Sequence, residues 1–238
     1  MPFGLSRPLI VRALPFVLFM ILLAVRGELP ADGSAGFDPR WVYGLTVLIV
    51  GAALAFFWRE YPELGAGSGL AAGPLVLSVV AGVAVFAAWI QLDYPWMQLD
   101  HLMASIGMGK AGQAAATFRP VDAQGHLIWP LVGVRWIGAA LLVPVMEELF
   151  WRSFLMRWVD NPDFEKVDPR AVTVKAVALS TFVFKLAHTL WLAAILAGLV
   201  YAWLYRRTGS LWAPIVAHGV TNGLLGAWVV FTGNWQFW

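Results

Sequence analysis

The sequence predicts an all-α fold, namely a polytopic bundle of about seven or eight transmembrane helices. Of its 238 residues, 60% are hydrophobic and only 13% are charged, and the mean hydropathy is +0.72. Roughly half of a soluble globular sequence is apolar, so a water-soluble domain of this length could not bury so much apolar surface. Apolar runs near the roughly 20 residues that a membrane span needs recur along the chain.

Seven candidate spans alternate with more polar loops. They are Leu9–Val25, Trp41–Trp58, Leu70–Leu92, Leu127–Val143 continuing into Glu147–Val159, Ala171–His188, Trp191–Tyr205 and Leu211–Phe231. We therefore expect three regions. Residues 1–92 form N-terminal transmembrane helices, residues 93–126 form an interfacial loop or lid, and residues 127–238 form a C-terminal transmembrane core.

Two stretches differ from plain spans. The segment after residue 92 is too polar to cross a membrane, but apolar residues recur in it at helical spacing, which indicates a short interfacial helix or a lid. These residues are Trp96, Leu99, Leu102, Met103 and Ile106. The stretch Leu127–Val159 is too long for one span and contains Pro144. A proline interrupts a helix and frees a carbonyl, which membranes tolerate where the segment lines a cavity.

Charge and cysteine content exclude several functions. A net charge of +2 is too small to indicate nucleic acid as a partner. The absence of cysteine excludes disulfides, thiolate metal sites and a cysteine nucleophile. The first apolar run resembles a signal peptide but has no small-residue cleavage site before Asp32, so we expect a retained helix. The positive-inside rule places the N-terminus and the Arg206–Arg207 turn in the cytoplasm.

The first polar cluster lies in the sequence VPVMEELFWRSF. Glu148 and Arg152 are four residues apart, so on a helix they share a face and can form an ion pair that offsets the cost of burial. Glu147 is rotated by about 100° from Glu148 and lacks that partner. A carboxylate without a cation in a poorly solvated site can act as a general base. The alternative is that both carboxylates are solvated at the cytoplasmic end of the helix.

Two further pairs with four-residue spacing follow on later helices. Phe184 and His188 lie in FVFKLAH, and His218 and Asn222 lie in APIVAHGVTN. Each pair has a structural alternative. His188 could be a core histidine bonded to a backbone carbonyl, and the second pair could serve helix–helix hydrogen bonding.

Together the clusters bring Glu147, His188, His218 and Asn222 within reach of one point. A carboxylate base, two imidazoles and an amide donor suit the activation of water and the stabilisation of an oxyanion, which peptide hydrolysis requires. We therefore expect an active site in a cavity between the C-terminal helices. The two histidines reach a common depth only if the fifth span begins in the cytosol, with Lys175 at the interface.

The motifs E-E-x3-R, F-x3-H and H-x3-N, in this order, resemble the CPBP family. This family contains the CAAX prenyl endopeptidases of the Ras-converting type and bacterial bacteriocin-processing relatives. The stretch YRRTGSLWAPIVAHGVTN is also similar, and the resemblance covers roughly Leu131–Leu225. The details WRSFLMRW and NWQFW (Asn234–Trp238) resemble the CAAX-protease-related proteins found beside exosortase and PEP-CTERM sorting systems.

The resemblance implies an intramembrane endopeptidase that acts on a membrane-tethered or lipidated protein. In this family's pattern, Glu147 would activate water with the help of His188. His218 and Asn222 would stabilise the oxyanion. Three neighbouring side chains would support the site: Glu148, Arg152 and Phe184.

The same resemblance raises the question of a metal, because the family was long described as metalloproteases. Glu147, His188 and His218 could bind zinc as a His2Glu set. The role of Asn222 fits a metal-free glutamate mechanism better, so we expect no cofactor. The expected partners are the lipid bilayer and a membrane-anchored or lipidated substrate, with no nucleic acid. The expected location is the bacterial cytoplasmic (inner) membrane.

Two other functions compete with proteolysis. The main alternative is a non-catalytic membrane partner, such as an immunity or scaffold protein of an export or sorting system, because a fold does not dictate a function. It predicts that Glu147→Ala leaves function intact. A transporter is disfavoured, because the sequence has neither a repeat nor paired broken helices.

Overall fold

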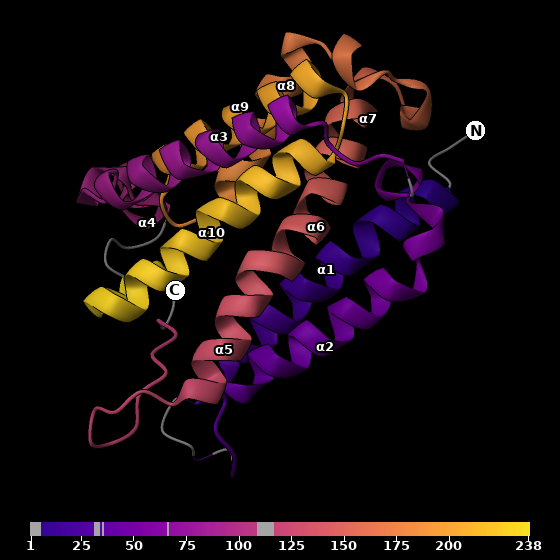
Figure 1. Cartoon of the computed structure of the whole chain (residues 1–238). Coiled ribbons are helices and arrows are strands. Elements are labelled where there is room, and N and C mark those ends of the chain that lie inside the picture. Colours follow the sequence, from indigo (N-terminus) through magenta and orange to yellow (C-terminus); the bar gives the residue numbers. More distant parts are fainter. Residues whose placement is uncertain (1–5, 31–33, 35, 66, 109–116) are drawn as a thin grey trace.

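The computed structural model describes residues 6–30, 34, 36–65, 67–108 and 117–238, and within these ranges the chain is all-α (Figure 1). Strands are absent from the described ranges, where isolated bridges pair Gln98 with Leu190 and Val121 with Leu127. The described chain has eight continuous helices, so the predicted all-α bundle of about seven or eight helices is confirmed. They are α1 (Arg7–Glu28), α2 (Trp41–Phe56), α3 (Ala72–Gln91), α4 (Leu99–Ser105), one long helix (Trp129–Asp160), α8 (Val174–Leu186), α9 (Trp191–Thr208) and α10 (Trp212–Thr232).

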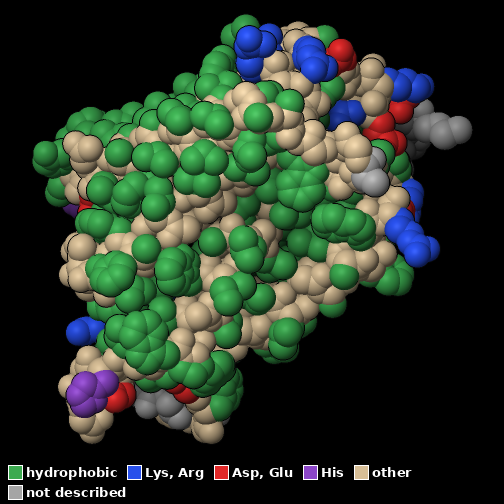
Figure 2. All heavy atoms as spheres, in the orientation of Figure 1, with side chains coloured by type: hydrophobic (Ala, Val, Ile, Leu, Met, Phe, Trp, Pro, Cys, Tyr) green, Lys and Arg blue, Asp and Glu red, His purple; other side chains and the backbone are tan. Residues whose placement is uncertain are grey.

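The outer surface of the bundle is apolar. In the described part of the chain, four helices are long and apolar enough to cross a membrane: α1, α3, the long helix and α10. Large side chains such as Leu48, Phe56 and Phe231 are exposed, and Figure 2 shows hydrophobic side chains spread across this face of the molecule. Soluble monomers rarely expose such extended apolar patches. The chain is therefore an integral membrane protein.

The long helix combines α-helical and π-helical turns. It contains α5 (Trp129–Ile137), α6 (Val143–Glu148) and α7 (Arg157–Asp160), separated by π-helical stretches over Gly138–Leu142 and Leu149–Met156. The interruption predicted at Pro144 takes the form of the first π-helical stretch, and the helix does not end there. The wider turn accommodates a ring that would otherwise crowd the carbonyl four residues earlier.

The bundle has two ends, which we name by the position of α1. At the N-terminal end, α1 begins and α2 ends, and Arg7 on α1 pairs with Glu60 after α2 across 2.7 Å. The same end holds the turn before α10, where Ser210 Oγ donates to Ser68 O. At the opposite end, α1 ends and α2 begins, and Arg40 beside the start of α2 donates to the carbonyl of Val121. In Figure 1 the start of α1 lies at the first of these ends.

A buried ionic contact attaches α1 to the long helix. Arg12, which is 1% exposed, donates to both carboxylate oxygens of Glu63 across 2.9 Å and to Ser153 Oγ across 3.0 Å. Ser153 also donates to Glu63. Ser153 lies in the second π-helical stretch, next to Arg152, so this contact holds the N-terminal helices against the predicted site.

Helix α3 packs closely against α10. A Cβ atom added at Gly82 would lie 2.4 Å from the carbonyl oxygen of Ala217, so only glycine permits this approach. Thr221 Oγ1 on α10 lies 2.9 Å from the carbonyl oxygen of Gly82. Small residues allow membrane helices to approach in this way.

The segment between α3 and the long helix contains the predicted short helix. Helix α4 begins at Leu99, and Leu99 N–H donates to Thr189 O across 2.7 Å, which joins this segment to the turn beside His188. Residues 109–116 of the predicted lid lie outside the described residues. Its role as a lid and the limits of the three regions remain predictions.

Candidate active site

A cavity of about 1020 Å³ lies between the C-terminal helices and the side chains that α1 and α3 direct towards them. All four residues predicted to do chemistry line it: Glu147, His188, His218 and Asn222. Phe184 also lines it. The structure thus brings together side chains from the long helix, from the turn after α8 and from α10.

Glu148 connects the long helix to α10. Its side chain is fully buried, and its Oε1 atom accepts hydrogen bonds from Arg152 Nη1 at 3.1 Å and from His218 Nδ1 at 2.9 Å. The ion pair predicted from the four-residue spacing is therefore formed. An ionised carboxylate only accepts, so His218 carries a proton on Nδ1. His218 Nε2 can then donate to a second group only when the ring is positively charged.

Arg152 contacts α9 and two aromatic rings in addition to Glu148. Its Nη2 atom donates to the carbonyl of Gly198 on α9 across 3.3 Å. The guanidinium also lies over the rings of Phe184, at 4.8 Å, and Tyr201, at 5.4 Å. These contacts keep a buried cation in place through hydrogen bonds and aromatic faces, and they give Phe184 its supporting position.

Glu147 differs from its neighbour in the way predicted. Glu147 is 8% exposed and lines the cavity, whereas Glu148 is fully buried and does not line it. Each carboxylate has an Oε2 atom without a hydrogen-bond partner among the described residues. A buried carboxylate oxygen without a partner is costly. Glu147 is therefore able to hydrogen bond a water molecule or a substrate in the cavity, whereas Oε1 of Glu148 is committed to Arg152 and His218.

His188 lies two residues beyond the last residue of α8. Its Nδ1 atom lies 2.8 Å from the carbonyl oxygen of Phe184, and because a carbonyl only accepts, Nδ1 carries the proton. In the neutral ring Nε2 is then an acceptor, as a base requires. The backbone contact considered as a structural alternative does occur, but it occupies one nitrogen and fixes the role of the other.

His188 and His218 line the same cavity, so they reach a common depth in the bundle. Helix α8 begins at Val174 and has 13 residues, so it is about 20 Å long at roughly 1.5 Å per residue. That is shorter than the roughly 30 Å hydrocarbon core. The short helix allows the turn with His188 to lie inside the bundle.

Asn222 contacts the carbonyl that Pro144 leaves free. In the first π-helical stretch Val143 N–H bonds to Gly138 O, five residues back, so the matching partner of Ala139 O would be the N–H that Pro144 lacks. The Nδ2 atom of Asn222 donates to Ala139 O instead, across 2.9 Å. The freed carbonyl that the sequence predicted is thus present. An amide has two N–H donors, so the second remains for a substrate.

The predicted zinc alternative fits these side chains poorly. Among the described residues, no group of three or more His, Cys, Asp or Glu side chains is arranged to hold a metal ion. The expectation of no cofactor remains a prediction.

Residues 129–224 match the family model described as type II CAAX prenyl endopeptidase, Rce1-like. This part of the chain is an Rce1-like domain. The predicted resemblance to the CAAX prenyl endopeptidases is confirmed. Comparison with the curated proteins and with the solved structures gave no match. The Rce1-like domain contains all seven residues that the motifs selected, and α1, α2 and α3 lie outside it.

Sequence reasoning missed two aromatic residues around the Rce1-like site. The ring of Tyr201 on α9 stacks on His218, with centroids 5.1 Å apart and planes 20° apart. Its hydroxyl donates to Thr221 Oγ1 across 2.8 Å. Trp89 on α3, outside the domain, packs edge to face on His188 at 5.8 Å. The sequence signal for Tyr201 is an aromatic residue with a hydroxyl group among the small residues of α9. No local pattern marks Trp89.

Arginine side chains line the approach to the Rce1-like site at the opposite end. Arg26 and Arg135 both line the cavity and both lie over the ring of Phe118, at 5.0 and 5.8 Å. Arg40 is paired with Asp38. Its hydrogen bonds hold the pKa of Asp38 below the ordinary value. Two guanidinium groups on one ring give the approach a positive potential.

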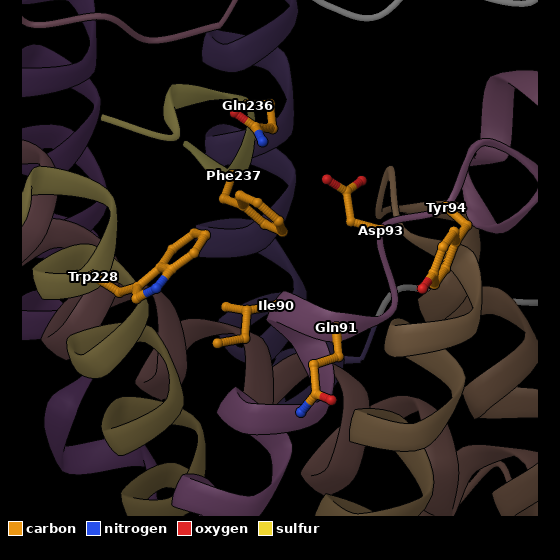
Figure 3. A pocket seen from close by; sticks show the side chains of 7 residues that line it. All are labelled: Ile90, Gln91, Asp93, Tyr94, Trp228, Gln236 and Phe237. Carbon is orange, nitrogen blue, oxygen red and sulfur yellow. The ribbon is translucent and has the colours of Figure 1, made fainter. Parts of the chain in front are cut away.

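A smaller cavity of about 420 Å³ adjoins this approach (Figure 3). It lies between the end of α3 and the end of α10, and it shares Asp93, Gln236 and Phe237 with the larger cavity. The rings of Trp228 and Phe237 meet edge to face at 5.2 Å on one side of it. The two cavities therefore meet at the opposite end of the bundle.

Proposed function

We propose that the chain is an intramembrane endopeptidase that hydrolyses a peptide bond in a membrane-tethered or lipidated protein. The observation that carries the proposal is the division of labour between the adjacent carboxylates. Glu148 accepts hydrogen bonds from His218 and Arg152, whereas Glu147 lines the cavity, which Glu148 does not reach. The match of residues 129–224 to an endopeptidase family supports the same function.

The proposed reaction begins with water held between Glu147 and His188. Glu147 accepts a proton as the water oxygen attacks the carbonyl carbon of the scissile bond, and the acceptor Nε2 of His188 orients the water. The carbonyl oxygen becomes an oxyanion. His218 Nε2–H, in the charged ring that Glu148 stabilises, and the second N–H of Asn222 donate to it.

Collapse of the tetrahedral intermediate completes the cycle. The carbon–nitrogen bond breaks, and the proton held by Glu147 passes to the departing amine. The products are a new carboxylate and a new amine, and Glu147 returns to its ionised form. The metal-free form of this mechanism is part of the proposal.

The substrate class follows from the access route. The smaller cavity between α3 and α10 has a mixed lining, in which Ile90, Trp228 and Phe237 are apolar and Gln91, Asp93 and Gln236 are polar, and it meets the larger cavity. The apolar side chains offer contact to a lipid chain or an apolar helix, and the polar ones suit an attached polypeptide that extends towards the site. This arrangement supports a tethered substrate, including a prenylated one, and we propose the bacterial cytoplasmic membrane as its location.

The test is hydrolysis by the purified protein in lipid nanodiscs. The substrates are membrane-anchored peptides, offered with a prenyl group, an acyl chain or a transmembrane helix, and products are identified by mass spectrometry. We expect cleavage by the wild type and loss of cleavage in Glu147→Gln, which keeps size and shape. The matched control is Asp163→Asn, the same chemical change at an exposed residue at the N-terminal end.

Thermal unfolding in the same lipid discs shows whether each variant is folded. Cleavage by Asp163→Asn but not by an equally stable Glu147→Gln supports the proposal. If Glu147→Gln cleaves as fast as the wild type, Glu147 is not the base. If no anchored peptide is cleaved while deletion of the gene is complemented by Glu147→Gln, the chain acts as a non-catalytic membrane partner.

A further inference from the structure

The larger cavity reaches the surface at one end of the bundle. Its walls run from Glu147 and His218 to loop residues at the opposite end, and these include Asp38, Arg119 and Asp122. Among its lining residues there is none from the described loops of the N-terminal end, which are 57–71, 161–173 and 208–211. The route to the predicted catalytic residues is therefore one-sided.

The two ends differ in their basic residues. Among the described residues, seven Lys and Arg residues that are not buried lie at the N-terminal end: Arg7, Arg59, Lys166, Arg170, Lys175, Arg206 and Arg207. In the described chain, five lie towards the opposite end: Arg26, Arg40, Arg119, Arg135 and Lys185. In Figure 2 the Lys and Arg side chains of this face gather at the end where α1 begins in Figure 1.

Basic loops remain in the cytoplasm because translocating them across the membrane is unfavourable. The charge difference therefore points the N-terminal end towards the cytoplasm, by the same rule that gave the orientation predicted from the sequence. It follows that the entrance of the cavity faces the other side of the membrane.

We propose that the site is entered from the extracytoplasmic face, so that it acts on polypeptide segments that have already crossed the membrane. This proposal rests on the proposed endopeptidase function for its substrate class. The substrate is an exported protein that is still tethered in the bilayer, with its scissile bond on the extracytoplasmic side. The guanidinium groups of Arg26 and Arg135, which form no ion pair within the described residues, suit an acidic stretch beside that bond.

A labelling experiment tests the direction of entry without relying on hydrolysis. The chain has no cysteine, so single cysteines can be introduced into an unreactive background. Ala123→Cys reports the entrance, Ala187→Cys reports the cavity wall beside His188, and Lys166→Cys reports the N-terminal end. Spheroplasts that express each full-length variant are treated with a membrane-impermeant sulfonated maleimide and, for Ala187→Cys, with a small charged methanethiosulfonate.

We expect Ala123→Cys and Ala187→Cys to be modified in intact spheroplasts and Lys166→Cys to be modified only after permeabilisation. The reverse pattern would place the entrance in the cytoplasm and overturn the proposal. Modification of Ala123→Cys without Ala187→Cys would also overturn it, because the site would then be closed from that face. Repeating the labelling in the Glu147→Gln background separates this result from the proposed function, since accessibility does not require catalysis.

Discussion

The side-chain amide of Asn222 donates a hydrogen bond to the carbonyl oxygen of Ala139, 2.9 Å away. Ala139 is the residue whose π-helical backbone partner would be the N–H that Pro144 lacks. One contact therefore satisfies a buried carbonyl and orients the remaining N–H of Asn222. The structural role and the proposed catalytic role of this side chain can be separated by experiment.

We expect Asn222→Ala to lower kcat about 10²- to 10³-fold, the usual cost of removing one oxyanion donor. It should also lower the free energy of unfolding by about 1–3 kcal/mol, because Ala139 O loses its partner. Cleavage of an anchored peptide measures the first effect, and thermal unfolding in lipid discs measures the second.

Pro144→Ala provides the control, because it restores a backbone N–H in the long helix. In the double variant Asn222→Ala/Pro144→Ala we expect stability to recover while turnover stays low. Recovery of turnover together with stability would show that Asn222 serves only to hold the helices together.

Glu148 is expected to act through His218. Glu148→Gln keeps an oxygen that can accept from His218 but removes the charge that stabilises the imidazolium and pairs with Arg152. Breaking a buried pair by removing one partner costs about 3–5 kcal/mol, so thermal unfolding should reveal a marked loss. Turnover should fall as well, because a neutral His218 cannot donate from Nε2.

The double variant Glu148→Gln/Arg152→Met separates these two effects. Removing both charges should restore part of the stability, because no uncompensated guanidinium remains. Turnover should stay low, because His218 still lacks its carboxylate. Normal turnover in either variant would contradict the positioning role of Glu148.

Tyr201 offers a test of a residue that no motif selected. Tyr201→Phe keeps the ring that stacks on His218 and loses the hydrogen bond to Thr221, so we expect turnover near that of the wild type. Tyr201→Leu removes the aromatic face, and we expect His218 to be less well oriented and kcat to fall. Equal turnover of the two variants would show that the stack has no role in hydrolysis.

The contact between Arg12 and Glu63 predicts a dependence of stability on pH. Burial alone would raise the pKa of Glu63, but hydrogen bonds and charge from Arg12 outweigh it, so the pKa lies below its ordinary value of 4.5. A carboxyl group with a lowered pKa stabilises the folded state above its ordinary pKa, and this contribution is lost as pH falls through the lowered value. Thermal unfolding in lipid discs should therefore show a loss of stability below about pH 4.5.

Glu63→Gln is the matched variant for this test. It should be less stable at neutral pH and should lose less stability on acidification than the wild type. The same acid-induced loss in both proteins would assign the effect to other carboxylates.

The sequence predicted the features that depend on local spacing. Apolar runs located the helices to within a few residues, and the four-residue spacing of Glu148 and Arg152 predicted their ion pair. Pro144 correctly indicated a freed carbonyl. The type of helix around it could not be read, because a π-helical turn depends on what the neighbouring helix offers to the displaced carbonyl.

Contacts between helices far apart in the chain could not be predicted from the sequence, for a physical reason. The bond between Glu148 and His218 joins residues 70 positions apart, and the packing of Trp89 on His188 joins α3 to the turn after α8. Such partners depend on the direction in which each apolar helix faces, and a helix that is apolar on all sides carries no periodic signal for this.

The close approach of α3 and α10 at Gly82 limits how the protein can be divided. Residues 129–224 carry every motif, yet Thr221 bonds to a carbonyl of α3, and the Tyr201 hydroxyl bonds to Thr221. A chimaera that grafts only the matched residues onto unrelated membrane helices would leave α10 without its neighbour. The smallest unit that can be transplanted therefore includes α3 with Gly82. Helix α3 supports the site directly and does more than anchor the chain in the membrane.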